Sequence, residues 1–178
     1  MITILCAHPN SHYHKIANLD IYDKSRDAWT FNGLNPVIAH PPCAQWSRLK
    51  FFAHSNHSEK ELAIRCYEKV LQNGGALEHP MGSSLWKYLG LQKKVISVDQ
   101  HWFGFPARKQ TYIWFNKCKA VSSPLLFDRY KTKVDKMAYL SKSITPLLFN
   151  QWLVDSILSS PQLKFIAESP EPPRQWHQ

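Results

Sequence analysis

The chain has 178 residues, 44% of them hydrophobic and 13% aromatic, which is enough for one domain with a sizeable core and too little for two. Its 22 Lys and Arg against 13 Asp and Glu give a formal charge of +9, which favours nucleic acid or nucleotides as partners over the alternative of a lysine-rich solvated surface. No run of about 18 apolar residues and no secretory signal pattern is present, so we expect a cytoplasmic protein without membrane association.

The first part of the chain predicts strands that end in polar or proline-containing turns. Residues 2–7 are typical of a buried strand, and a second strand is expected at 16–22. After a polar turn or short helix at 23–31, a third strand at 36–40 runs into two prolines, which continue neither a ladder nor a helix. We therefore expect Cys43 on a loop at the C-terminal end of a strand.

The clearest helix is expected at 58–75. Ser58 and Glu61 are spaced as a capping box, and Gly74 is placed to end the helix. The chain then enters a strand at 75–80 that again ends in proline. A helix between two strands is typical of a parallel crossover.

The second half predicts a hairpin and one more helix. Strands at 95–105 and 110–115 bracket a basic turn, and a helix is expected at 145–160 with Thr145 as its N-cap and Pro146 in its first turn. We predict an α/β fold with a reduced Rossmann-like, mostly parallel sheet and an antiparallel hairpin at one edge. One domain would span residues 1–165, followed by a proline-rich tail at 166–178. Ligands of such sheets bind at the carboxyl edge of the strands.

Cys43 has the setting of a nucleophile. Two prolines present it rigidly at the tip of a buried strand, and His40 and Arg48 are near enough in sequence to stabilise a thiolate. The alternative is a packing cysteine in a proline turn. Packing is what we expect of the other cysteines, which show neither disulfide nor zinc spacing: Cys6, Cys66 and Cys118.

Three short motifs follow one another between residues 36 and 115. They are PPCAQWS at 41–47, LEHP at 77–80 and FGFPARKQTYIWF at 103–115. In order and approximate spacing they resemble the Pro-Pro-Cys-Gln-x-x-Ser, Glu-Asn-Val and Phe/Tyr-Gly-x-Pro-Gln-x-Arg-x-Arg motifs of the DNA cytosine-5 methyltransferases. The His-Pro-Pro-Cys and Glu-His-Pro pattern is also similar to that of small phage proteins called methyltransferase-like. The resemblance implies a pared-down methyltransferase fold and a DNA-modification protein, located in the host cytoplasm if phage-encoded.

The resemblance also implies roles for the catalytic candidates. Cys43 would add to ring carbon 6 of a pyrimidine, and Glu78 would hydrogen-bond the Watson–Crick edge of the base as charge develops. Without the resemblance, a glutamate at a strand end would be ordinary. His40 and His79, together with His8, follow predicted strands and could act as acid or base in the same cleft.

Substrate-binding candidates come from the matching segments. They are Pro42, Trp46, Ser47, Arg48, Arg108, Lys109 and Thr111. We expect Trp46 to stack on the base, and Arg108 or Lys109 to contact a base carbonyl or a phosphate. The chain departs from the family in having His79 for Asn, Ala107 for Gln, and Lys109 and Thr111 for the two arginines, so base recognition must differ in detail.

The N-terminal segment departs further from the family. The resemblance implies S-adenosylmethionine as cofactor, yet residues 1–35 contain Gly33 as their single glycine where the family has a glycine-rich loop. If that cofactor is bound, an atypical turn must hold it, with Asp20 or Asp23 as the ribose-binding acid or else as plain surface aspartates. The spacing of the histidines and carboxylates leads us to expect no metal.

The chain has no room for a separate target-recognition domain, which favours a single-stranded, flipped or free nucleotide as substrate. We predict a pyrimidine-modifying enzyme that forms a covalent Cys43 adduct on DNA or a nucleotide. The alternative is a catalytically degenerate methyltransferase fold that binds nucleic acid, a nucleotide signal or a host protein, for instance as a counter-defence factor.

Overall fold

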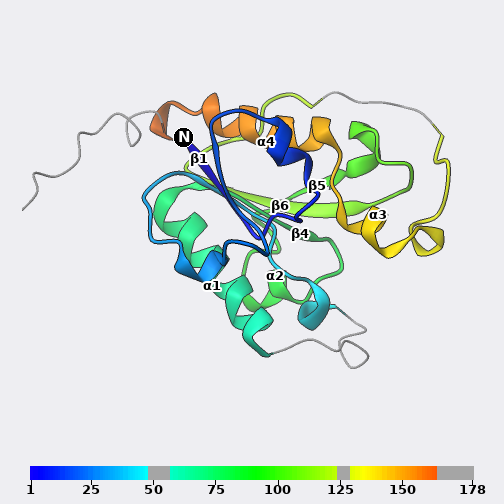
Figure 1. Ribbon diagram of the computed structural model, residues 1–178, viewed down its shortest axis with the longest axis horizontal. Helices are drawn as coiled ribbons and strands as arrows, with labels where there is room; N and C mark the ends of the chain where they lie inside the picture. The colour runs from blue at the N-terminus through cyan, green and yellow to red at the C-terminus, as the bar shows by residue number, and fades with distance from the viewer. Residues whose placement is uncertain (48–56, 124–128, 164–178) are drawn as a thin grey trace, which may run out of the picture.

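One six-stranded sheet organises the residues that the computed structural model describes, 1–47, 57–123 and 129–163 (Figure 1). In the order β2-β1-β3-β4-β6-β5, the strands are β2 (Leu19–Tyr22), β1 (Ile2–Leu5), β3 (Val37–Ala39), β4 (Gly75–Pro80), β6 (Gln110–Asn116) and β5 (Ile96–Asp99). The first four pair in parallel, whereas β6 runs antiparallel to both β4 and β5. The predicted α/β class and the antiparallel hairpin at one edge are confirmed.

Helices cover both faces of the sheet. Figure 1 shows α1 (His57–Asn73) and α2 (Leu85–Tyr88) on one face and α4 (Leu147–Leu158) on the other, with the short α3 (Tyr139–Ser143) near the β5–β6 end. Within the described ranges, none of these helices is long and apolar enough to cross a membrane.

The core lies on both sides of the strands. In β3, Val37 packs in the cluster that contains Val70 of α1, while the next residue, Ile38, packs in the cluster that contains Phe149 and Leu153 of α4. All five side chains are fully buried. Burial on both faces explains why β3 is continuously apolar in sequence.

Two consecutive glycines connect α1 to β4. Gly74 has φ +83° and its N–H donates to Val70 O at 2.9 Å, which confirms the predicted end of the helix. Gly75 has φ +124°, and a Cβ there would lie 1.9 Å from Val37 O of the neighbouring strand. The close approach of β3 and β4 therefore depends on glycine at position 75.

The expected strand at 95–105 is wrong beyond Asp99. The carboxylate of Asp99 accepts the N–H of His101 at 3.1 Å and starts the 3-10 helix η5 (Gln100–Phe103), which Gly104 closes with φ +93°. The second strand likewise begins at Leu19 and not at residue 16, because the 3-10 helix η1 (His12–Lys15) precedes it.

Two predicted helix caps differ from the structure. Helix α1 begins at His57, so Ser58 lies in its first turn and not at the N-cap position. In α4 the N-cap is Pro146, and the hydroxyl of Thr145 instead donates to the side-chain oxygen of Asn150 at 2.5 Å. The predicted tail at 166–178 lies outside the described residues.

The cysteines are free thiols, as expected. Cys66 of α1 is buried and its sulfur lies 3.6 Å from that of Cys6, which follows β1 with φ +60°. The contact with Cys6 and burial raise the pKa of Cys66 well above 9.0. Both thiols therefore serve packing between α1 and the end of β1.

Candidate active site

The carboxyl edge of the sheet gathers the polar side chains that the motifs singled out. His40 directly follows β3, and Glu78 lies near the end of β4. Because β6 is reversed, its first residues lie at this same edge, where Thr111 pairs with Pro80. The short η5 after β5 adds Gln100.

Glu78 is 8% exposed and sits at the centre of a hydrogen-bond network. Its Oε2 lies 2.9 Å from Nδ1 of His40, and its Oε1 accepts from the hydroxyl of Thr111 and, at 3.5 Å, from the amide of Gln100. Burial alone would raise the pKa of Glu78, but the hydrogen bond and charge of His40, the Thr111 hydroxyl and the charge of Lys109 outweigh it and lower the pKa to about 2. The carboxylate is therefore ionised at neutral pH.

Tyr13 extends this network from the β1–β2 connection. Its hydroxyl lies 2.8 Å from Nε2 of His40. Burial, followed by the negative charge of Glu78, raises the pKa of Tyr13 well above 10.0, so the hydroxyl keeps its proton. An ionised Glu78 only accepts hydrogen bonds, so His40 donates to it through Nδ1. When the ring is neutral, its Nε2 accepts a hydrogen bond from the Tyr13 hydroxyl. The two partners thus set the tautomer and orientation of the ring.

Cys43 is exposed and lies just before the 3-10 helix η3 (Ala44–Trp46). Its carbonyl accepts the N–H of Trp46 at 3.1 Å, which closes the loop behind the two prolines. Protein atoms around the sulfur disfavour the thiolate, so desolvation and then the charge of Glu78 raise the pKa of Cys43, against the opposing charge of Lys109. The thiol is protonated at rest, and it lies within electrostatic reach of both charged groups.

Lys109 supplies the positive charge at this edge. Its ammonium group donates to Lys142 O at 2.7 Å and lies 4.8 Å from the ring centre of Phe105. Burial lowers the pKa of Lys109, while the charges of Glu78 and Cys43 attract the protonated form. The structure thus brings the predicted Lys109 and Thr111 to the site, whereas the neighbouring Arg108 is exposed and lines a separate cavity.

His79 does not line the cleft as expected. Its side chain is fully buried, its Nε2 donates to Pro42 O at 3.4 Å, and its ring meets Trp86 edge-on with the centroids 6.3 Å apart. Burial lowers the pKa of His79 to about 4, despite the charge of Glu78 and the Pro42 contact. A neutral, enclosed imidazole supports the Pro-Pro-Cys loop from below and has no access to a substrate.

The buried imidazole of His79 predicts a pH dependence of stability. Its folded pKa of about 4 lies below the unfolded value of about 6.5, so the unfolded chain binds the proton first as pH falls. The free energy of unfolding should drop by up to about 3 kcal/mol between pH 6.5 and 4. Urea titrations across this range should show a flatter pH profile for His79→Gln than for the native chain. The same replacement at half-buried His8 is the control and should leave the profile unchanged.

The expectation that Trp46 stacks on a base is wrong. The residue is 3% exposed and packs with Ala63 of α1 and Leu85 of α2, with its ring centroid 5.3 Å from that of Tyr88. Neighbouring helices already cover the indole faces, so no base can reach them. Ser47 is half-buried at the end of η3, while Arg48 lies outside the described residues.

The two aspartates expected to bind a cofactor are engaged locally. Asp20 pairs with Arg26, and Asp23 accepts the N–H and the hydroxyl of Ser25, each at 2.7 Å. These Ser25 hydrogen bonds lower the pKa of Asp23. The β1–β2 connection forms η1 and contains no glycine.

The N-terminal histidines have other partners. His12 Nδ1 lies 2.9 Å from Thr145 O, and His14 lies 3.6 Å from the carboxylate of Asp23. His8 is half-buried and its Nδ1 accepts the N–H of Asn10 at 3.1 Å. Across the part of the chain that the structure describes, no group of three or more His, Cys, Asp or Glu could hold a metal.

The site combines an exposed thiol, an ionised carboxylate held by a histidine, and a partly desolvated ammonium group. Sequence reasoning missed Tyr13 and Gln100, whose roles depend on contacts with residues far away in the chain. In such a set the thiol can add to an electrophilic carbon of a ligand, while the charged groups bind the polar edge of the same ligand. No protein-family model matches the chain, and no curated protein matches it at a significant level.

Proposed function

We propose that this protein modifies a pyrimidine base through a transient covalent bond between Cys43 Sγ and ring carbon 6. One observation carries the proposal. The exposed thiol after β3 and the ionised Glu78 of the adjacent β4 lie at one edge of the sheet, where the charge of Glu78 raises the pKa of the thiol. Ligands of open α/β sheets bind at this edge.

The residues divide the chemistry in the following way. The Cys43 thiol loses its proton to water at its exposed face, sulfur bonds to carbon 6, and the electron pair of the 5,6 double bond moves to carbon 5. Glu78 accepts a hydrogen bond from an N–H at the polar edge of the base, and Lys109 stabilises negative charge that develops on the ring carbonyl. Protonation of carbon 5 by water completes a net addition of S–H, and the reverse steps release the base.

The adduct makes carbon 5 nucleophilic before it is protonated. This intermediate is common to methyl transfer, hydroxymethylation and related exchanges at a pyrimidine, which is the chemistry that the Pro-Pro-Cys resemblance implies. No step of the mechanism uses S-adenosylmethionine, because the β1–β2 connection lacks a glycine-lined loop and both nearby carboxylates are engaged.

A covalent trap tests the proposal. A short oligonucleotide that contains pyrimidin-2-one offers a carbon 6 that is more electrophilic than that of cytosine and needs no second reactant. We expect intact-protein mass spectrometry to show one added oligonucleotide on the native chain and none on Cys43→Ser, because the hydroxyl is a far weaker nucleophile.

A second thiol provides the control for this experiment. Burial raises the pKa of half-buried Cys118 to about 11, and its sulfur donates to Gly75 O at 3.2 Å. Cys118→Ser should therefore form the adduct as the native chain does. Equal adduct on Cys43→Ser and the native chain would contradict the proposed nucleophile.

A second candidate function is binding without chemistry. It is favoured by the buried Tyr13, which occupies the β1–β2 connection, and by the raised pKa of Cys43, which keeps the thiol protonated. In that case a native chain that binds the oligonucleotide forms no adduct at any pH up to 9. The trap therefore separates the two functions with one set of proteins.

A further inference from the structure

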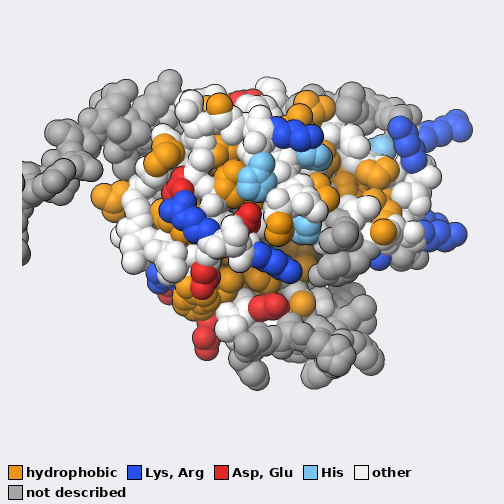
Figure 2. Space-filling model, in the orientation of Figure 1, with side chains coloured by type: hydrophobic (Ala, Val, Ile, Leu, Met, Phe, Trp, Pro, Cys, Tyr) orange, Lys and Arg blue, Asp and Glu red, His pale blue; other side chains and the backbone are white. Residues whose placement is uncertain are grey.

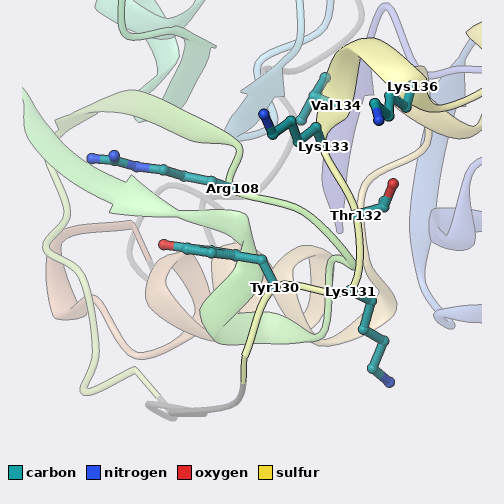
Figure 3. A pocket seen from close by; sticks show the side chains of 7 residues that line it. All are labelled: Arg108, Tyr130, Lys131, Thr132, Lys133, Val134 and Lys136. Atoms are coloured by element: carbon teal, nitrogen blue, oxygen red, sulfur yellow. The ribbon is translucent and has the colours of Figure 1, made fainter.

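A cavity of about 600 Å³ is lined by Arg108, which directly precedes Lys109 of the candidate active site, and by residues outside the network described above. Arg108 lines it from the turn before β6, and Tyr130, Thr132, Lys133 and Lys136 line it from the segment before α3. Figure 3 shows the side chains of Arg108 and Tyr130 running alongside each other in the same direction, whereas Lys131 points away. In the space-filling view, Lys and Arg side chains project from this end of the molecule (Figure 2). The volume is that of a small-ligand site.

The walls of the cavity are held in place. The ring of Tyr130 lies 4.5 Å from that of His101, centroid to centroid, and its hydroxyl donates to Asp99 at 3.3 Å. The N–H groups of Lys131 and Thr132 both donate to Pro106 O, at 2.9 and 3.2 Å. The basic segment is therefore fixed against the β5–β6 connection and is not a loose chain of lysines.

The charged residues that line the cavity are all basic, among the residues that the structure describes. Arg108, Lys133 and Lys136 are all exposed, and none forms an ion pair with a described residue. Three exposed cations around one cavity favour a ligand with more than one negative charge. Phosphate groups suit such a site because guanidinium and ammonium groups both bind them.

Tyr130 adds a second kind of contact. Its side chain is 52% exposed although its hydroxyl and one ring neighbour anchor it. An anchored, exposed aromatic ring among cations is the arrangement with which proteins bind single-stranded nucleic acid, the bases stacking and the phosphates pairing with Lys and Arg.

We propose that this cavity binds a nucleotide that neighbours the reacting one in a single strand, with its phosphates at Arg108, Lys133 and Lys136 and its base on Tyr130. The proposal rests on the proposed function, which places the reacting nucleotide at Cys43 and Glu78 and its neighbour in this cavity. Arg108 in the cavity and Lys109 at Glu78 are consecutive residues, so one strand can reach both. The substrate is then a strand and not a free nucleotide.

Fluorescence anisotropy with a labelled twelve-residue oligo(dA) tests the cavity alone, since this strand has no pyrimidine. Arg108→Gln/Lys133→Gln should weaken binding at least tenfold and lower the slope of log K against log salt by about 1.4, because each lost phosphate contact contributes about 0.7 for a single strand. Tyr130→Ala should weaken binding about fivefold or more, and Tyr130→Phe should retain it.

The control variant removes two cations elsewhere. Lys93→Gln/Lys94→Gln makes the same change of charge before the opposite end of β5, and it should bind oligo(dA) within twofold of the native chain. Unlabelled deoxycytidine monophosphate and inorganic phosphate should compete at least a hundredfold more weakly than the strand. Equal loss in the control, a preference for duplex of the same sequence, or equal competition by the mononucleotide would each overturn the proposal.

The two proposals fail in different ways. If Cys43 forms no adduct but oligo(dA) binding depends on Arg108, Lys133 and Tyr130, the strand site stands and the covalent function falls. If the adduct forms equally well on the pyrimidin-2-one nucleoside monophosphate and on the oligonucleotide, and Arg108→Gln/Lys133→Gln affects neither, the strand site falls and the covalent function stands.

Discussion

Replacing Glu78 with glutamine should lower the rate of adduct formation about 100-fold or more. The variant loses the negative charge that accepts from the base and holds His40, and the loss of one preorganised polar group at a reacting centre has an effect of this size. An amide also presents its NH₂ group to donors that now face Glu78, so we expect a loss of stability of about 1–3 kcal/mol.

Two measurements separate the chemical role of Glu78 from its structural one. The rate of adduct formation is compared without urea, at a pH at which circular dichroism shows that both proteins are folded. Glu68→Gln on the exposed face of α1 is the control. Because the folded pKa of about 2 lies below the usual 4.5, native stability should also fall as pH drops from 4.5 towards 2, by up to about 3 kcal/mol. Glu78→Gln should lack that loss. An unchanged rate in a folded variant would remove Glu78 from the mechanism.

Replacing Gly75 with alanine should destabilise the protein by at least about 3 kcal/mol. The new Cβ would lie 1.9 Å from Val37 O, which is backbone and has no freedom to turn aside, and φ of +124° is itself unfavourable for alanine. Relief requires β3 and β4 to move apart, which would break the pairing of Val37 with Gly75. Urea unfolding followed by circular dichroism measures the loss.

The same substitution at Gly82 is the matched control. No atom lies within 4 Å of its ideal Cβ and its φ is not positive, so Gly82→Ala should change stability by less than about 0.5 kcal/mol. Since Cys43 follows β3 and Glu78 lies in β4, any Gly75→Ala protein that folds should also lose adduct formation. A stable and active Gly75→Ala would mean that the β3–β4 contact is looser than the structure shows.

Local patterns were sufficient to predict the elements that position the site. The strand at Ile2–Leu5 is marked by its own apolar residues, and the end of α1 is marked by its capping glycine, Gly74. Both signals lie within or next to the element, so the sequence predicts them. The prolines after β3 and at the end of β4 likewise mark strand ends from the sequence alone. The edge that carries Cys43 and Glu78 followed from these features.

Long-range contacts decided what the sequence could not predict. Trp46 is buried only because α1 and α2 close over it, and no neighbour in sequence indicates this. Tyr13 reaches His40 across 27 positions of the chain. The overall excess of Lys and Arg predicted a polyanionic partner or a solvated surface, but no cavity. The cavity is formed because the Pro106 carbonyl accepts hydrogen bonds from Lys131 and Thr132.

The antiparallel direction of β6 reduces the number of residues that are needed to build this edge of the sheet. A parallel strand at this place would require a crossover of a dozen or more residues and would begin at the far end of the sheet. By reversing, the chain turns back within the ten residues between Asp99 and Gln110, and this single connection carries Gln100, Arg108 and Lys109, with Thr111 immediately behind it. A short connection can thereby bring polar and basic groups together at one edge of the sheet.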